Sequence, residues 1–348
     1  MTAGVSKVSP KNPGLSKQTQ MGEYEKREAV AAGLAHDYEF DPTHGYRLAD
    51  LLQVGAPEEP PDYAAFWHER YKMALAVDPL STLRDTGEDH GRWRIHDFSY
   101  VSTWGTEIRG WALLPRAGDV RRAFLIGHGY AGRSGPDFDW EFEDAALFFP
   151  CARGLGRSWN SSISSETRWH VLHDIQSRSR YVLGGCVEDV WVGATAVLGL
   201  LPQAGGHLGY IGSSFGGGIG AMAVGWDERI RRAHLSVPTF GNQPLRMTLP
   251  TTGSGASVQK FLKKHPKAAD VLKYYDAAVA ARHVKIPVLC ACALFDPSVS
   301  PAGQFAIYNA LTGPKELFVL TAGHHDYPAL GAEDAELRQK VYNFFADI

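Results

Sequence analysis

The sequence feature that most constrains the fold is the glycine-rich stretch at residues 209–218, which reads GYIGSSFGGG. A short apolar run leads into the pattern Gly212-x-Ser214-x-Gly216, and a helix-like segment follows at 219–226. This order is typical of a nucleophile elbow, a sharp and strained turn that presents a serine at the tip of a strand. Glycines are expected there because a Cβ would collide with the crossing strand and helix. A chain with 37 glycines can contain the pattern by chance, so its surroundings must support it.

The surrounding pattern from residue 123 onward is an alternation of short apolar runs with helical stretches. Continuous apolar strands separated by helices predict an α/β fold with a mostly parallel twisted sheet and helices on both faces. The expected strands are residues 123–126, 147–152, 208–211, 233–237, 286–294 and 317–320. Two alternating segments that precede them, 92–100 and 107–114, are expected to form a pair of strands.

The domain organisation predicted from the chain is a flexible N-terminal tail, residues 1–22, followed by a single domain, residues 23–348. An N-terminal helical extension is expected at 24–36, and Asp62 can cap a second helix after a proline-rich break. The long excursion 238–284 between two strands predicts a cap-like insertion over the carboxyl edge of the sheet. It either shapes substrate access or only packs.

Composition narrows the possible partners and compartment. The formal charge of −3 argues against nucleic acid or an anionic membrane as a partner. Four cysteines are too few for a disulfide framework, and Cys290 and Cys292 are expected as small buried thiols on a strand. The N-terminus has no apolar core of a signal peptide, and the longest apolar run, 190–201, is too short to span a bilayer. The sequence therefore predicts a cytoplasmic protein that needs no membrane.

Ser214 needs a base and an acid to act as a nucleophile. In hydrolases built on such a sheet, the acid and then the base follow the serine on loops after later strands. Asp296 follows the strand 286–294, and His324 follows the strand at 317–320. Each residue alone is more commonly a turn or surface residue, but their order and placement together predict a Ser214–His324–Asp296 triad. The adjacent His325 remains the alternative base.

An oxyanion hole requires two backbone N–H groups near the serine. One is expected from Phe215, directly after the nucleophile. The other is expected from the loop after strand 123–126, which reads Gly-His-Gly-Tyr, and the amide of Tyr130 is the candidate.

Two rival sites can be built from the same sequence. Residues 216–221 match the dinucleotide fingerprint G-x-G-x-x-A, but the next strand ends without the acidic residue that such a site needs. His170, His173 and Asp174 could hold a metal, but they lack a clear helical frame and are more simply loop residues. We therefore expect neither a cofactor nor a metal.

Taken together, these motifs resemble the acetyl xylan esterase / cephalosporin C deacetylase family, carbohydrate esterase family seven. The resemblance runs from about Pro61 to the C-terminus. It is carried by Phe66-Trp67, residues 108–115, His128-Gly129-Tyr130, Arg153-Gly154, the Ser214 elbow, Asp296, and Gly323-His324 with Tyr327 and Pro328.

The resemblance implies a single α/β-hydrolase domain that removes acetyl groups from sugars and related small esters without a cofactor. It also implies a homo-oligomer. By position, Ser214, Asp296 and His324 match the nucleophile, acid and base, while the amides of Tyr130 and Phe215 match the oxyanion hole. Arg153 matches the structural arginine of an Arg-Gly-Gln motif.

Three departures from the family pattern bear on the substrate. Phe215 and Leu155 stand where the family has glutamines, and His325 replaces the usual glutamate. Phe215 keeps its backbone amide, but its ring could narrow the acyl pocket. The sequence thus predicts a serine carboxylesterase acting on acetylated sugars or related small esters. The alternatives are another hydrolase activity (lactonase, peptidase or thioesterase) or a hydrolase-fold binding protein without turnover.

Overall fold

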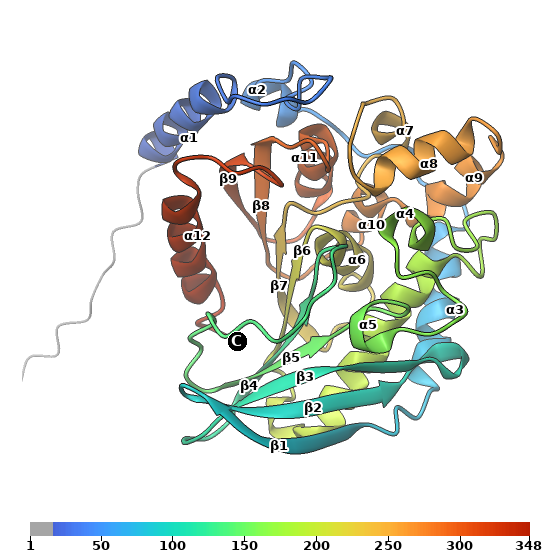
Figure 1. Cartoon of the computed structure of the whole chain (residues 1–348), viewed down its shortest axis with the longest axis vertical. Coiled ribbons are helices and arrows are strands. Elements are labelled where there is room, and N and C mark those ends of the chain that lie inside the picture. Colours follow the sequence, from blue (N-terminus) through green and yellow to red (C-terminus); the bar gives the residue numbers. More distant parts are fainter. Residues whose placement is uncertain (1–16) are drawn as a thin grey trace, which may run out of the picture.

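The computed structural model describes residues 17–348, so most of the predicted tail, residues 1–16, lies outside the described residues. One nine-stranded sheet in the order β1-β2-β3-β5-β4-β6-β7-β8-β9 organises the molecule (Figure 1). The pairs among β1, β2, β3 and β5 are antiparallel, and all pairs from β5 to β9 are parallel. The strands are β1 (Thr82–His90), β2 (Trp93–Val101), β3 (Glu107–Pro115), β4 (Arg122–Gly127), β5 (Ala145–Pro150), β6 (Leu208–Ser213), β7 (Ile230–Ser236), β8 (Val288–Phe295) and β9 (Lys315–Ala322). The predicted mostly parallel sheet is confirmed.

Helices cover both faces of this sheet, as predicted. Figure 1 shows α12 on one side and α3, α5 and α6 on the other. Each face carries its own buried cluster: Phe124, Leu289 and Phe345 belong to the smaller one, and Trp67 and Trp191 to the larger. The helices are α1 (Lys17–Ala31), α2 (Leu48–Leu51), α3 (Tyr63–Leu75), α4 (Thr167–His170), α5 (Val182–Leu200), α6 (Phe215–Ala223), α7 (Gln243–Arg246), α8 (Ser254–Leu262), α9 (Ala268–Leu272), α10 (Ala277–Ala281), α11 (Pro301–Ala310) and α12 (Leu330–Phe344).

The N-terminal helix α1 lies along the edge strand β9. The Tyr24 hydroxyl donates to the carbonyl of Leu317 at 2.9 Å, and Arg27 donates to the carbonyl of Val319 at 2.6 Å. These contacts cover an edge that would otherwise offer unpaired backbone groups. The helix begins at Lys17 and ends at Ala31, so residues 17–22 are helical and do not belong to a tail, and the expected helix at 24–36 was placed too late.

Two elements were not located by the sequence analysis. Strand β1 was not predicted, since most of its side chains are exposed and it has no apolar face. Helix α5 runs from Val182 to Leu200 and contains most of the long apolar run 190–201. By length and composition α5 is the only helix in residues 17–348 that could cross a membrane, yet 78% of its apolar window is buried inside the protein. It is the core helix of the larger cluster.

The insertion between β7 and β8 holds helices α7 to α10 and is fixed to the carboxyl edge of the sheet. Thr251 donates to the carbonyl of Ser298 at 2.8 Å, and Thr252 donates to the carbonyl of Pro297 at 3.1 Å. Both acceptors belong to the loop that directly follows β8. The insertion therefore borders the place where the predicted acid Asp296 lies, and its effect on substrate access stays a prediction.

Candidate active site

The turn between β6 and α6 holds Ser214 in a strained conformation, with φ 52° and ψ −110°. Its flanking glycines are required by close backbone contacts. A Cβ at Gly212 would lie 2.4 Å from the carbonyl oxygen of Gly216, and a Cβ at Gly216 would lie 2.7 Å from the carbonyl carbon of Gly127. Helix α6 begins at Phe215, four residues earlier than expected, because its first turn consists of glycines that carry no helical signal.

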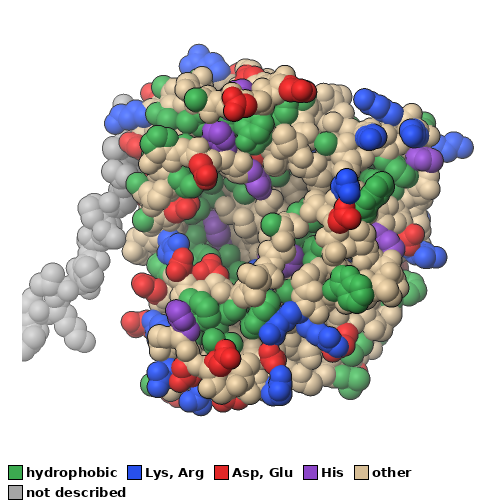
Figure 2. Space-filling model, viewed as in Figure 1, with side chains coloured by type: hydrophobic (Ala, Val, Ile, Leu, Met, Phe, Trp, Pro, Cys, Tyr) green, Lys and Arg blue, Asp and Glu red, His purple; other side chains and the backbone are tan. Residues whose placement is uncertain are grey.

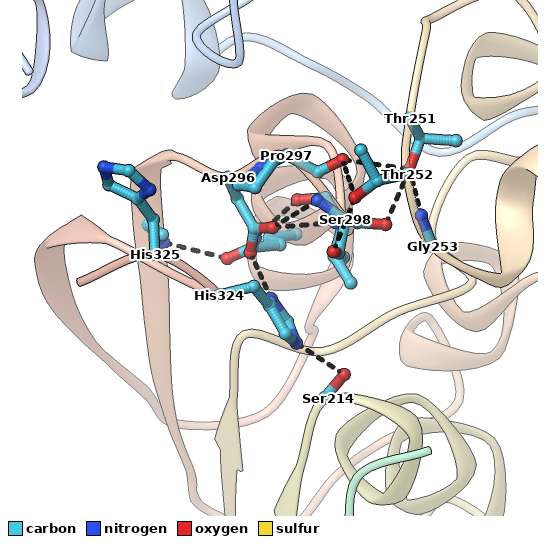
Figure 3. Close-up of polar contacts among 12 residues, drawn as sticks. Ser214, Thr251, Thr252, Gly253, Asp296, Pro297, Ser298, His324 and His325 are labelled. Carbon is cyan, nitrogen blue, oxygen red and sulfur yellow. Dashed lines mark hydrogen bonds and ion pairs between the residues drawn. The ribbon is translucent and has the colours of Figure 1, made fainter. Parts of the chain in front are cut away.

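The structure brings the three predicted side chains into one hydrogen-bonded chain (Figure 3). The Ser214 hydroxyl donates to Nε2 of His324 at 2.9 Å, and Nδ1 of His324 donates to Oδ2 of Asp296 at 2.8 Å. The alternative base, His325, points away from the serine (Figure 3). Its ring packs on Phe295, and its Nδ1 lies 3.4 Å from the hydroxyl of Tyr38. The geometry therefore favours His324 as the base.

Asp296 is fully buried, and each carboxylate oxygen has donors besides the histidine. The amides of Ser298 and Val299 donate to Oδ1, each at 2.8 Å, and Nε2 of Gln304 donates to Oδ2 at 3.0 Å. Such donors fix the orientation of the carboxylate. Gln304 was not predicted, since a glutamine inside α11 gives no sign in the sequence of what it contacts.

The protonation of His324 depends on two opposing effects. Burial disfavours the charged imidazolium, while the hydrogen bond and the negative charge of Asp296 favour it. The effects of Asp296 prevail, so the pKa of His324 lies above its ordinary value of 6.5. A stronger base accepts the serine proton more readily. The same raised pKa means that the imidazole of His324 becomes protonated in mildly acidic solution.

The loop after β4 runs alongside the nucleophile. A Cβ at Gly129 would lie 3.7 Å from the Cβ of Ser214, so the backbone of this loop is in contact with the serine. The amides of Tyr130 and Phe215, the predicted oxyanion donors, have no protein acceptor within residues 17–348. One amide directly follows Ser214 and the other directly follows Gly129, so both remain candidates for stabilising an oxyanion.

His128 fixes this loop in place through both ring nitrogens and its carbonyl. Nδ1 donates to the carbonyl of Gly129 at 2.6 Å, and Nε2 accepts from the amide of Ala152 at 2.9 Å. The carbonyl of His128 accepts from the amide of Gly216, also at 2.9 Å. Burial lowers the pKa of His128 to about 4, in keeping with a neutral ring that both donates and accepts. The sequence pointed to this loop but not to this role.

Arg153 supports the same loop from behind. Its guanidinium pairs with Asp189 through bonds of 2.6 and 2.9 Å, and its carbonyl accepts from Nε2 of His170 at 2.9 Å. Nδ1 of His170 in turn accepts from the hydroxyl of Tyr130 at 3.2 Å. His170, considered above as a metal ligand, thus links Arg153 to Tyr130 in the loop after β4. No group of three metal-ligating side chains occurs in the described part of the chain.

The side chain of Phe215 packs against two other aromatic rings. Its ring centroid lies 4.3 Å from that of Tyr130 and 6.1 Å from that of Phe240, a residue of the insertion. Phe240 is held close because the amide of the preceding Thr239 donates to the carbonyl of Ser214 at 3.2 Å. An aromatic side chain thus follows Ser214 at the position where the family has a glutamine, and its effect on the acyl pocket stays a prediction.

Comparison with known proteins places these features in context. The family model for acetyl xylan esterase (AXE1) matches residues 48–345. The acetyl xylan esterase from Paenibacillus sp. R4 is 21% identical, with a TM-score of 0.74 over 84% of this chain and 98% of that one. Acetyl xylan esterase 1 from Thermoanaerobacterium sp. JW/SL YS485 is 18% identical, with a TM-score of 0.70 over 87% and 100%. The α/β-hydrolase GrgF from Penicillium sp. sh18 is 16% identical, with a TM-score of 0.51 over 72% and 97%. The predicted α/β-hydrolase fold is confirmed.

Proposed function

We propose that this chain, which belongs to the acetyl xylan esterase family and is a serine ester hydrolase, removes acetyl groups from acetylated sugars or related small esters through Ser214, His324 and Asp296. The observation that carries the proposal is the hydrogen-bonded chain from Asp296 through His324 to Ser214, beside two free backbone amides. Acyl transfer requires a base, a nucleophile and oxyanion donors, and these groups can supply all three.

In the first half of the reaction, the Ser214 oxygen attacks the ester carbonyl carbon while Nε2 of His324 takes the hydroxyl proton. Asp296 keeps the imidazole in the tautomer whose Nε2 is free and stabilises the imidazolium. The amides of Tyr130 and Phe215 donate to the carbonyl oxygen as it becomes negative. When the tetrahedral intermediate collapses, His324 gives the proton to the departing sugar oxygen, and an acetyl group remains on Ser214.

The second half repeats these steps with water. His324 takes a proton from a water molecule, whose oxygen attacks the acetyl carbonyl, and then returns the proton to Ser214 as acetate leaves. The same amides stabilise the second oxyanion. All proton transfers pass through one side chain, so His324 must be neutral at the start of each half.

The aromatic rings of Phe215, Tyr130 and Phe240 favour an acetyl group over longer acyl groups. The ring of Phe215, the residue after Ser214, lies within packing distance of the rings of Tyr130 and Phe240. Because Phe215 and Phe240 are buried, a longer acyl chain that reached them would have to displace them, which costs free energy in a packed interior. Acetate is the acyl group that requires the least displacement.

Hydrolysis of p-nitrophenyl acetate, butyrate and octanoate tests this function. We expect kcat/KM to fall steeply with acyl length, and Ser214→Ala to lower hydrolysis of the acetate by about 1,000-fold or more. Ser213→Ala is the matched control, because it removes a neighbouring hydroxyl at the end of β6 that takes no part in the hydrogen-bonded chain. Full activity in Ser214→Ala would contradict the proposal, and a preference for octanoate would contradict the acetyl specificity.

We also propose that the chain forms a homo-oligomer through the face around Trp104 and Trp159. These side chains are 68% and 63% exposed and line one cavity of about 670 Å³. Exposed tryptophans are enriched at protein interfaces because they bury a large apolar area. Light scattering after size-exclusion chromatography should give a mass above 38.1 kDa for wild type. The mass should approach that value in a Trp104→Ala/Trp159→Ala variant, and a monomeric wild type would contradict the proposal.

A further inference from the structure

Four arginines are buried within residues 17–348, and three of them have a carboxylate partner. Arg27 pairs with Glu336, Arg70 with Glu188 and Arg153 with Asp189. Arg246 at the end of α7 is as buried, at 6% exposure, but no carboxylate lies within 4.0 Å of its guanidinium in the described part of the chain. A buried charge without a counter-charge is costly and is rarely kept without a function.

The groups in direct contact with the Arg246 guanidinium are neutral. Nη1 donates to Oε1 of Gln243 at 3.3 Å and Nη2 to Oγ of Ser254 at 3.2 Å, while the guanidinium lies 5.3 Å from the ring centroid of Phe240. Burial lowers the pKa of Arg246. The nearby carboxylate of Asp276 is occupied with capping, since it accepts from the amides of Asn242, Gln243, Ala278 and Val279. Asp276 therefore uses its oxygens on backbone donors and forms no hydrogen bond with Arg246 in the described part of the chain.

The first turn of α8 lies against the same guanidinium. A Cβ at Gly255 would lie 3.3 Å from Nη2 of Arg246, so no side chain separates the helix from the arginine. The N-cap is Gly253, which provides no capping side chain, and the amides of Ser254 and Gly255 have no acceptor within the described residues. A helix N-terminus carries partial positive charge, so the arginine and the helix attract the same anion.

Two aromatic rings connect this positive site to the residue after Ser214. The guanidinium of Arg246 lies 5.3 Å from the ring centroid of Phe240, and that centroid lies 6.1 Å from the ring centroid of Phe215, which directly follows Ser214. The insertion that supplies Arg246, Phe240 and α8 therefore forms one border of the proposed acyl site.

The outer surface of this insertion is also basic. Figure 2 shows Lys and Arg side chains gathered at the upper right, over α8 and α9. Lys260, Lys263, Lys264 and Lys267 are exposed there, and none has an acidic partner within 4.0 Å among the described residues. Because the whole chain has a formal charge of −3, this concentration of lysines is local. It would raise the concentration of anionic substrates near the site.

We propose that Arg246 and the first turn of α8 form a subsite for a carboxylate, so that the preferred substrate is an anionic acetyl ester such as an acetylated sugar acid. A carboxylate fits because its two oxygens can take two parallel N–H bonds from the guanidinium, and its single charge balances the single unpaired arginine. The inference rests on the proposed function, since it names the substrate class of the same site.

Matched esters that differ in one charge test the subsite. The probes are 3- and 4-acetoxybenzoate and their methyl esters, and the quantity measured is the ratio of kcat/KM for acid over methyl ester. We expect wild type to prefer at least one acid by about 10-fold or more, as a charged hydrogen bond can provide. Arg246→Gln should abolish that preference, and Arg246→Lys, which keeps the charge without the planar fork, should retain part of it. Arg231→Gln on the exposed part of β7 is the control and should keep the wild-type ratio.

A measurement on wild type alone covers the case in which Arg246→Gln fails to fold. The products 3- and 4-hydroxybenzoate and their methyl esters are compared as inhibitors of p-nitrophenyl acetate hydrolysis, and at least one acid should bind about 10-fold more tightly than its ester. Equal ratios in wild type and Arg246→Gln, or acids and methyl esters that act alike on wild type, would overturn the subsite. Hydrolysis of the neutral ester that depends on Ser214 would leave the proposed function intact in that case, whereas loss of all Ser214-dependent hydrolysis would overturn the function itself.

Discussion

The Cα of Gly323 lies directly against the carboxylate of Asp296: a Cβ added at Gly323 would be 2.5 Å from Oδ2. That oxygen is the one that accepts from Nδ1 of His324. Close packing of the backbone at the residue before the histidine thus sets the position of the carboxylate relative to the imidazole. The position requires glycine because any side chain would meet the carboxylate.

Gly323→Ala should therefore impair catalysis through Asp296. The added methyl would displace the fully buried carboxylate, and we expect kcat for p-nitrophenyl acetate to fall by about 10-fold or more, as misplaced catalytic groups typically do. Gly331→Ala near the start of α12 is the matched control, because a Cβ there meets no atom within 4 Å. Equal kcat values for the two variants would show that the contact at Gly323 does not position the acid.

The pH dependence of hydrolysis should reflect the raised pKa of His324. Only the neutral imidazole can accept the serine proton, so kcat/KM for a neutral ester should rise with pH and reach half its plateau above pH 6.5. Asp296→Asn removes the charge that raises the pKa. It should move that midpoint downward and lower the plateau by about 1,000-fold or more. A midpoint that does not move in Asp296→Asn would contradict the assigned pair.

Phe215→Ala should change acyl-length selectivity more than it changes activity on acetate. The backbone amide remains to donate to the oxyanion, while removal of the ring opens space next to Tyr130 and Phe240. We expect the ratio of kcat/KM for p-nitrophenyl butyrate over acetate to increase by about 10-fold, in line with burial of two additional methylenes. If the ratio stays constant, Phe215 does not limit the acyl pocket.

Stability at acidic pH should fall because of buried neutral histidines. Burial lowers the pKa values of His128, His170 and His234 to about 4 in the folded chain, from an ordinary value of 6.5. Between pH 6.5 and 4 the unfolded chain therefore binds more protons, so the free energy of unfolding should decrease as pH falls, by about 1.4 kcal/mol per pH unit for each histidine.

Urea unfolding at pH values from 7 to 4 measures this slope. His234→Asn removes one such group on β7 and should flatten the decline, even though the loss of the bond from His234 to the carbonyl of Leu289 lowers stability at pH 7. The exposed His265→Gln serves as the control and should keep the wild-type slope. Identical slopes in wild type and His234→Asn would contradict a neutral His234.

The sequence predicted those features that depend on local patterns. Apolar runs located the parallel strands, and the glycine pattern located the turn at Ser214, because both follow from backbone geometry. The positions of Asp296 and His324 could be inferred because carboxyl ends of parallel strands meet at one edge of a sheet. The choice between His324 and His325 needed coordinates, since adjacent residues differ in direction and not in sequence context.

Features that arise from contacts between distant segments could not be inferred. Gln304 contacts Asp296 from helix α11, and His170 links Arg153 to Tyr130. Only the folded chain shows that Arg246 is buried beside neutral partners. Strand β1 was missed for a different reason. It is an exposed edge strand without an apolar face, and only its backbone pairing with β2 identifies it as a strand. Side-chain partners far apart in the chain leave no local pattern.

Ser214 should carry the acyl group during turnover. Wild-type protein mixed with p-nitrophenyl acetate can be quenched in acid within milliseconds and digested, and the peptide containing Ser214 examined by mass spectrometry. We predict an acetyl adduct on Ser214 that appears with a burst of p-nitrophenol, decays as substrate is consumed, and is absent in Ser214→Ala. An acetyl adduct on another residue that forms and decays at the rate of turnover, with Ser214 unmodified, would contradict the role of Ser214 as nucleophile.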